Sequence, residues 1–366
     1  MTHLTCGFIG LGLIGGSIAR ALKEKLPDTK IIAYDINPDT LIAARESNVA
    51  DITTSTIDEN FRTCDYLFLC APVQKNDENL KAVKTVLSPD CLLTDVGSVK
   101  NDIHCAIEEA GLNARFIGGH PMAGSERVGF INSKAVLLEN AYYILTPTKE
   151  VPAEKVQAYR QLVQTLGAIP LVLTSEQHDY VTAAVSHLPH IIAAALVNLV
   201  HDHDSSEGIM KMIAAGGFKD ITRIASSSAT MWQQICLTNT VNISQLLGDY
   251  ISSLTQIKMQ LDEQNAISLY DLFDSARIYR DSFINTASGP IKSSYSINVE
   301  IEDTPGALAS IATTLAQNNI SIKNIGIVHN REFEGGVLRI EFYEEDSIAK
   351  ANTLLSLKGF HIHAQK

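Results

Sequence analysis

The sequence is short of positive charge and of long apolar runs, and each shortage argues against a class of partner. Its 366 residues carry 29 Lys and Arg against 41 Asp and Glu, a formal net charge of −12 at neutral pH. Because a negative protein repels polyphosphate and anionic lipid, neither nucleic acid nor a membrane surface is expected as a partner. The longest strongly apolar stretch, residues 191–200, has about half the length that a transmembrane helix needs. No membrane span is therefore predicted.

Paired cysteines and a leader-like start are also lacking. The six cysteines include no C-x-x-C pair, and several lie in apolar strand-like runs, which indicates buried reduced thiols rather than a disulfide framework. Residues 1–5 hold no basic segment ahead of the first apolar run, so no signal peptide is expected, and the expected compartment is the cytoplasm. With 45% apolar and 19% charged residues the composition is globular, and at about 150 residues per domain the length predicts two or three domains.

The first part of the chain alternates short apolar runs with segments of helical length. The expected strands are residues 4–9, 31–34, 66–70, 91–95, 115–117, 142–145 and 169–173. Segments such as 37–47 and 99–110 have the length of helices. This βαβ alternation predicts a mainly parallel, doubly wound α/β sheet of the Rossmann type with helices on both faces, over residues 1–175.

The middle of the chain, residues 176–284, carries no strand pattern. Residues 242–261 keep apolar side chains at helical spacing, and residues 180–200 do the same around Pro189. The second domain is therefore predicted to be all-helical. Its wide apolar faces are best covered by a second copy of the chain, so we expect a homodimer.

The last part of the chain has the pattern of a small α+β domain. Residues 285–293 read as a linker, and apolar and polar residues then alternate over 295–302. A helix (306–317), a strand (320–328), a turn at Gly335-Gly336, a strand (337–343), a helix (347–356) and a strand (360–363) follow. This βαββαβ order predicts a ferredoxin-like domain over residues 294–366.

A glycine-rich turn after the first expected strand indicates a dinucleotide site. Gly10 allows the tight turn, Gly12 lets a pyrophosphate approach the backbone, and Gly15 lets helix and strand pack closely. The helix N-terminus, with Leu13 and Ile14, supplies amides and a favourable dipole. Asp35 ends the second expected strand, where it can accept bonds from ribose hydroxyls and repel a 2′-phosphate, which favours NAD over NADP. The alternatives are a purely structural turn and, for Asp35, a helix cap.

Three further loops follow expected strands at the edge where a bound dinucleotide lies, namely 70–73, 95–100 and 118–126. Ala71 and Pro72 in the first loop are expected to contact the cofactor. In the third, His120 lies between glycines and a proline on a restrained loop, where a neutral imidazole can take a hydroxyl proton as hydride leaves. Ser98 could orient that imidazole or cap the following helix. A loop histidine bonded only to backbone is the alternative for His120.

These motifs resemble those of the prephenate dehydrogenase family. The resemblance rests on residues 10–17 (GLGLIGGS), 95–100 (DVGSVK), 118–126 (GGHPMAGSE), 186–190 (SHLPH) and 216–225 (GGFKDITRIA), with Met231-Trp232 beyond. It covers about residues 4–284, and its last two motifs are not shared with dehydrogenases in general. The tail, with DTPGAL at 303–308 and NNISIKNI at 318–325, resembles an ACT domain, a module that commonly binds amino acids.

The resemblance implies a reaction and roles for four residues. Prephenate is a dianion, and its oxidative decarboxylation moves hydride from C4 to NAD while CO2 leaves C1. His120 would accept the proton of the C4 hydroxyl with Ser98 in support, while His190 and Arg223 would hold the carboxylate end of the substrate. A guanidinium suits that task because it pairs with a carboxylate through two hydrogen bonds. The alternative for Arg223 is a salt bridge inside the helical domain.

Other functions stay open at this point. Arogenate, which carries an ammonium group in place of the keto oxygen, would differ from prephenate by one or two contacts. A β-hydroxyacid dehydrogenase would use a helical lysine rather than His120, and a non-catalytic sensor of NAD and an amino acid would not need His120 at all. A metal site at His187 and His190 is not expected, because no further ligand accompanies them at a recognisable spacing.

The tail is expected to bind an effector rather than to catalyse. Gly306 exposes backbone amides before a helix, which could capture an amino-acid carboxylate, and Asn324 could take the ammonium end. By resemblance the effector is tyrosine, acting as a feedback inhibitor. The alternative is a dimerisation module without a ligand.

Overall fold

The computed structural model describes residues 4–71, 76–124, 127–285, 295–301, 304, 306–328 and 336–363. The chain divides into two compact units, Met1–Leu269 and Tyr270–Lys366. The first unit combines the two N-terminal domains expected above, and the division falls within a helix. The expected domain boundaries after residues 175, 284 and 293 therefore stay predictions.

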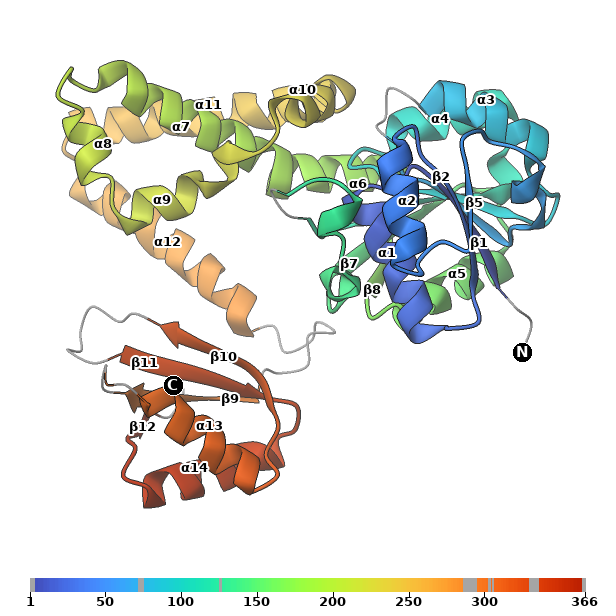
Figure 1. Ribbon diagram of the computed structural model, residues 1–366. Coiled ribbons are helices and arrows are strands. Elements are labelled where there is room, and N and C mark those ends of the chain that lie inside the picture. The colour runs from blue at the N-terminus through green and yellow to red at the C-terminus, as the bar shows by residue number, and fades with distance from the viewer. Residues whose placement is uncertain are drawn as a thin grey trace. The chain divides into compact units, whose positions relative to one another are not determined.

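An eight-stranded sheet forms the centre of the N-terminal part (Figure 1). Its strands run in the order β3-β2-β1-β4-β5-β6-β7-β8, and every neighbouring pair is parallel except β6 and β7. The strands are β1 (Thr5–Ile9), β2 (Lys30–Tyr34), β3 (Ile52–Thr54), β4 (Tyr66–Leu69), β5 (Leu92–Asp95), β6 (Phe116–Pro121), β7 (Tyr142–Pro147) and β8 (Ile169–Val172). The seven expected strands and the doubly wound fold are confirmed. Only β3, three residues long, gave too short a pattern to be predicted.

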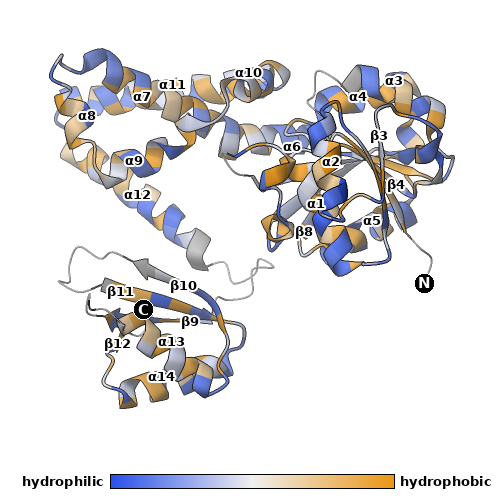
Figure 2. Cartoon of the chain, in the orientation of Figure 1, coloured by the Kyte–Doolittle hydropathy of each residue, from blue (hydrophilic) through white to orange (hydrophobic). Residues whose placement is uncertain are grey.

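Helices cover both faces of this sheet because neighbouring strand residues point to opposite sides. Phe8 belongs to the core on one face, with residues of α1 and α5, while the next residue, Ile9, belongs to the core on the other face, with residues of α3 and α4. The helices are α1 (Leu13–Lys25), α2 (Pro38–Glu46), α3 (Asn76–Val86), α4 (Asn101–Ala110) and α5 (Ala153–Thr165). Short 3₁₀ turns lie at Glu59–Thr63, Asn113–Arg115, Phe130–Asn132 and Ala135–Leu138. Figure 2 shows the strands mostly in the hydrophobic colour and the covering helices in both colours.

The middle of the chain is helical, as expected. It comprises α6 (Ser175–Thr182), a π-helical turn (Ala183–His187), α7 (Leu188–His203), α8 (Ile209–Ile213), α9 (Gly216–Thr222), a 3₁₀ turn (Arg223–Ser226), α10 (Ala229–Thr238), α11 (Thr240–Asp262) and α12 (Ala266–Asn285). Pro189 does not end the helix here. The turn before it widens instead, so that the amide of Leu188 donates to Ala183 five residues back, and the helix continues into α7.

The run Ser175–His203 is the one helix in the described ranges that is long and apolar enough to cross a membrane by length and composition alone. No membrane span was expected from the sequence, because the most apolar stretch, residues 191–200, is only ten residues long. The run also buries four polar side chains, His178, Asp179, Thr182 and His187. Those side chains are hydrogen-bonded within the protein, which is typical of a helix that builds a site.

The second unit contains the expected small α+β domain. Its elements are β9 (Tyr295–Ile301), α13 (Ala307–Gln317), β10 (Ile322–Val328), β11 (Gly336–Phe342), α14 (Asp346–Leu357) and β12 (Ile362–His363). The strands form an antiparallel sheet in the order β10-β11-β9-β12. Val299, Ile311 and Leu355 join strands and helices in one core. Gly335 of the expected turn lies outside the described residues.

Candidate active site

The glycine turn between β1 and α1 has the geometry that a dinucleotide needs. Gly10 has φ +90°, and a Cβ there would lie 2.8 Å from the amide nitrogen of Ala71. A Cβ on Gly15 would lie 3.0 Å from Cβ of Cys70, so this glycine lets α1 approach the end of β4. Gly12, by contrast, has nothing within 4 Å of its Cβ position, which leaves open space at the helix N-terminus.

The start of α1 and the end of β2 supply the groups that would hold NAD. Leu13 and Ile14 are the first two residues of α1, and no side chain caps that helix, so its N-terminal amides can bind a pyrophosphate. The half-buried carboxylate of Asp35 accepts the amide of Leu11 at 2.8 Å and that of Asn37 at 2.8 Å. Asn37 itself caps α2, so Asp35 is not the helix cap. Pro72 lies outside the described residues.

His120 lies on a strand and not on the loop that the sequence indicated. It is the fifth residue of β6 and faces Ile144 of β7 in the register. Gly118 and Gly119 precede it because neighbouring atoms leave no room for a side chain on the strand, and not because the chain turns. A Cβ on Gly119 would meet the carbonyl oxygen of Asp95, and one on Gly118 would overlap the hydroxyl of Thr146. The two glycines, which were read as part of a loop, therefore indicate close packing next to the candidate base.

A buried ion pair ties the loop after β5 to the strand that carries His120. Asp95 and Lys100 are both buried and bonded to each other. Lys100 Nζ also donates to the carbonyl of Gly119 at 2.9 Å, and Asp95 accepts the amides of Gly119 at 3.1 Å and Gly97 at 2.9 Å. Each charge is thus compensated by a partner and by backbone groups. Sequence reasoning noted this motif but assigned no role to its two charged ends.

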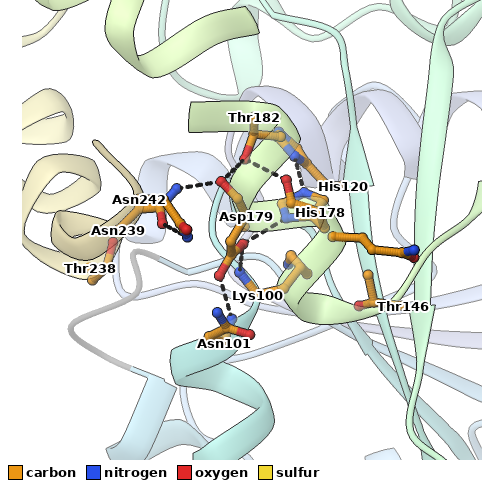
Figure 3. Close-up of polar contacts among 12 residues, drawn as sticks. Lys100, Asn101, His120, Thr146, His178, Asp179, Thr182, Thr238, Asn239 and Asn242 are labelled. Carbon is orange, nitrogen blue, oxygen red and sulfur yellow. Dashed lines mark hydrogen bonds and ion pairs between the residues drawn. The ribbon is translucent and has the colours of Figure 1, made fainter. Parts of the chain in front are cut away.

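A chain of hydrogen bonds runs from His120 into α6 (Figure 3). Nδ1 of His120 lies 2.8 Å from Nε2 of His178, whose Nδ1 lies 2.7 Å from Oδ1 of Asp179. The carboxylate of Asp179 also accepts the backbone amides of Lys100 and Asn101, each at 2.8 Å, and so caps the start of α4. Sequence reasoning missed His178 and Asp179, because α6 carries several other polar residues and no local pattern marks these two.

Ser98 is half-buried on the loop before α4. Because α4 begins at Asn101 and receives its cap from Asp179, Ser98 does not cap this helix. The bond to His120 that the structure describes comes from His178. The supporting role of Ser98 stays a prediction.

His187, Asn239, His190 and Trp232 form the helical side of the site. Asn239 donates to the carbonyl of Asp179 at 2.8 Å and lies 3.1 Å from Nδ1 of His187. Nδ1 of His190 lies 2.9 Å from the carbonyl of Ser186, and its ring stacks on Trp232 at 3.7 Å between centroids. The indole Nε1 of Trp232 is buried without a hydrogen-bond partner, so a donor remains for a bound molecule.

Arg223 lies exposed on the 3₁₀ turn after α9. Burial lowers the pKa of His190, and the positive charge of Arg223 lowers it further. Among the described residues no three histidine, cysteine, aspartate or glutamate side chains are grouped to hold a metal.

The histidines of the site are neutral near neutral pH. Burial lowers the pKa of His120 well below its ordinary value, and positive charge on His178 or Lys100 lowers it further. Burial likewise lowers the pKa of His178, and it lowers the pKa of His187 to about 4. A neutral imidazole can accept a proton, so this electrostatic environment suits a general base.

The two expected effector residues lie in the C-terminal domain. Gly306 has φ +95° and is the residue before α13, with open space at its Cβ position. Asn324 is exposed on β10, where its side-chain oxygen accepts the amide of Ile325 at 2.9 Å. Their role in binding an amino acid stays a prediction.

The fold and the glycine turn together define an NAD-dependent dehydrogenase, and comparisons with known proteins identify its family. Residues 18–171 match the nucleotide-binding domain of prephenate dehydrogenase, and residues 174–275 match its dimerization domain. The chain belongs to the prephenate dehydrogenase family, as the motifs indicated. It is an oxidoreductase that uses NAD.

Relatives and solved structures agree with this assignment. The chain is 36% identical to a prephenate dehydrogenase of Bacillus subtilis over 96% of this chain and 95% of the relative, and 32% identical to a cyclohexadienyl dehydrogenase of Zymomonas mobilis over 74% and 92%. A structure of Aquifex aeolicus prephenate dehydrogenase in complex with hydroxyphenyl propionate and NAD+ is 33% identical, covers 77% of this chain and 99% of that chain, and has a TM-score of 0.73. An arogenate dehydrogenase of Synechocystis is 29% identical, covers 76% and 100%, and has a TM-score of 0.69.

Proposed function

We propose that this enzyme oxidises and decarboxylates prephenate to 4-hydroxyphenylpyruvate. The observation that carries the proposal is His120, a neutral imidazole near the carboxyl end of β6, the end of the sheet at which the glycine turn follows β1. Charge on His187 lowers the pKa of His120 further. Charge on His190 in turn lowers the pKa of His187, and charge on Arg223 lowers the pKa of His190. The site therefore offers a base for a hydroxyl proton and a cation for a carboxylate.

The reaction divides into tasks that these residues can perform. His120 takes the proton of the C4 hydroxyl as the C4 carbonyl forms, and Arg223 with His190 binds the carboxylate end. NAD, held at the turn of Gly10 to Gly15, supplies the hydride acceptor. CO2 leaves C1 and the ring becomes aromatic, which provides the driving force. Because the base and the cation are on different elements, the substrate must span them, which fixes its orientation.

The second candidate is arogenate, and the likeness to an arogenate dehydrogenase of Synechocystis is the observation that keeps it open. Formation of NADH should be measured with prephenate and with arogenate, each with NAD and with NADP. We expect the highest kcat/KM for prephenate with NAD. A higher kcat/KM for arogenate would overturn the substrate assignment while leaving the reaction type intact.

The assembly we propose is a homodimer formed through the helical part. Its helices expose large apolar side chains such as Leu199, Ile213 and Leu237, and Figure 2 shows hydrophobic residues along α7 and α9. Large exposed apolar side chains of this kind are typical of an interface, and the family's model of this region is a dimerization domain. Light scattering on the purified enzyme should give twice the chain mass.

The cytoplasm is the compartment that we propose. All six cysteines are free in the structure, and burial raises the pKa of the Cys64 and Cys6 thiols, which keeps them unreactive. Unpaired thiols are typical of a reducing compartment. Cell fractionation followed by an activity assay tests this.

Regulation by tyrosine is the last part of the proposed function. The tail has the βαββαβ order of the domain that commonly binds amino acids, and Gly306 and Asn324 are its candidate contacts. We expect tyrosine to inhibit the enzyme through this domain.

A further inference from the structure

The hydrogen bonds around α6 determine which ring nitrogens carry protons. The carboxylate of Asp179 accepts two backbone amides, those of Lys100 and Asn101, and therefore acts as an acceptor. His178 must then donate to it from Nδ1, which leaves a lone pair on Nε2. That lone pair faces Nδ1 of His120 at 2.8 Å, so His120 must donate from Nδ1. The lone pair of His120 is consequently on Nε2, the nitrogen that remains to meet a substrate hydroxyl.

We propose that His178 and Asp179 are positioning residues of a two-histidine proton relay, which holds His120 in its Nδ1–H tautomer and removes the positive charge that forms on it. The proposal rests on the proposed function, because it needs a substrate proton to move. In the relay, the O–H bond of the substrate breaks and an N–H bond forms at Nε2 of His120. The Nδ1–H bond of His120 breaks and an N–H bond forms at Nε2 of His178. The net transfer is one proton, and the electron pair of the C4–H bond leaves as hydride to the bound nicotinamide.

The charges that surround His120 explain why a second ring is useful. His178, Lys100 and His187 are the positive or protonatable groups that act on it, and all three disfavour a second positive charge there. Asp95, which could compensate, is bonded to Lys100. His178 differs because its hydrogen bond to Asp179 favours the charged ring. Moving the charge one ring further therefore places it beside a carboxylate at 2.7 Å.

The protein fixes the geometry of this relay from several sides. Thr182 Oγ1 donates to the carbonyl of His178 at 2.9 Å, and Asn239 donates to the carbonyl of Asp179 at 2.8 Å. Both His178 and Asp179 are fully buried, so water does not compete for their hydrogen bonds. The carboxylate of Asp179 also caps α4, and so it holds the relay against the loop that contains Ser98 and Lys100.

The tautomers can be measured without any substrate. Nitrogen NMR of the full-length protein with labelled histidine should show His120 and His178 protonated at Nδ1 and unprotonated at Nε2 at neutral pH. Signals are assigned by the loss of one in His120→Asn and one in His178→Gln. A protonated Nε2 on His120 in the parental protein would overturn the relay, whatever the substrate is.

Two variants and a matched control test the relay in turnover. His178→Gln keeps an oxygen that accepts the Nδ1–H of His120 but cannot take its proton, so kcat should fall about 10- to 100-fold with both KM values within about threefold. His178→Leu loses the acceptor as well, and kcat should fall roughly 10-fold further. The control is His104→Gln, which removes a half-buried imidazole, bonded to Thr146 at 2.9 Å and absent from the relay, and should keep more than half of the parental kcat.

The pH profile separates the relay from a merely structural role. Without His178 the proton taken up by His120 cannot move on to a ring beside Asp179, so the protonated form is less stable. The pKa that sets the acid limb of kcat/KM should therefore fall in His178→Gln, which moves the limb to lower pH. Loosened packing that lets water reach His120 would move that limb up, toward the pKa of free histidine. An upward shift, or retention of more than half of the parental kcat in both His178 variants, overturns the relay. If the parental enzyme forms no NADH from prephenate, the proposed function fails, but the NMR result still decides the tautomers.

Discussion

Individual residues in this site serve purposes that their type alone does not reveal. Gly10 is needed for its positive φ, Gly12 for open space at a helix end, and Gly119 for close contact with the carbonyl of Asp95. The histidines differ in their partners, since Nδ1 of His120 is bonded to a second imidazole, that of His178, whereas Nδ1 of His187 is bonded to the side chain of Asn239. The role of a residue depends on its neighbours in space, and the sequence predicts those neighbours only where they belong to one long motif.

The substitution His120→Asn tests the base. An amide can still hydrogen-bond the C4 hydroxyl, but it cannot accept its proton, so kcat should fall about 10²- to 10⁴-fold with little change in KM. Steady-state rates of NADH formation measure both parameters. A variant that keeps more than half of the parental kcat would show that His120 is not the base.

The pH dependence of the parental enzyme follows from the neutral state of His120. The base works when it is unprotonated, so kcat/KM should rise as the pH rises through its pKa. Burial holds that pKa well below the ordinary histidine value, so the rise should be complete before about pH 6.5 and a plateau should follow. A profile of kcat/KM with prephenate at saturating NAD checks this. An acid limb centred above pH 7 would contradict it.

At the scale of elements, the sequence predicted types and order well but misjudged places where tertiary contacts decide. The seven strands other than β3 were visible as apolar runs, yet β6 extends through Gly118 and Gly119, where a loop was expected, because those glycines fit beside Thr146 and Asp95. The cap of α4 comes from Asp179, which is 79 residues away from Lys100 in the chain. No local pattern contains such a contact, and so the relay residues could not be placed from sequence.

We predict that Asp35, which follows β2 and bonds the glycine turn between β1 and α1, sets the choice of cofactor. Asp35→Ala removes a carboxylate that holds the amides of Leu11 and Asn37 and would bind the ribose, so the KM for NAD should rise about 10- to 100-fold, the equivalent of about 1.5–3 kcal/mol for bonds to a charged group. The preference for NAD over NADP should narrow as well, because a repulsive charge is lost. Asp39→Ala removes an equal charge in the first turn of α2 and serves as the control. Equal effects of the two variants on cofactor preference would show that net charge, and not Asp35, sets it.

At the scale of the whole molecule, charge and chain length bear on binding and regulation. A net charge of −12 opposes a dianionic substrate, and the site's buried cation, Lys100, is bonded to Asp95. We therefore expect Arg223 to supply much of the attraction for the substrate. The tail raises a separate question, because the Aquifex aeolicus structure is covered over 99% of its length by 77% of this chain. That structure therefore matches this chain without the remaining quarter, and we predict that the tail regulates the enzyme and does not catalyse.

Truncation after Ser288 tests that role, since it keeps α12 (Ala266–Asn285) and removes the sheet of β9 to β12 with Gly306 and Asn324. The truncated enzyme should retain its kcat, and tyrosine should inhibit it only competitively and weakly, because just the active site remains to bind it. In the full chain, binding at the tail and at the active site must be coupled with the same free energy in both directions, so prephenate should weaken tyrosine binding by the factor by which tyrosine weakens prephenate binding. Calorimetry of tyrosine binding with and without prephenate measures one direction, and inhibition kinetics measure the other.

Gly306→Val is the matched full-length variant: a branched side chain at φ +95° disturbs the start of α13 without removing the domain, and it should raise the tyrosine concentration for half-inhibition while leaving kcat unchanged. Identical tyrosine inhibition curves for the full-length and truncated enzymes would show that the tail is not the tyrosine sensor, and that it binds a different ligand or serves assembly alone.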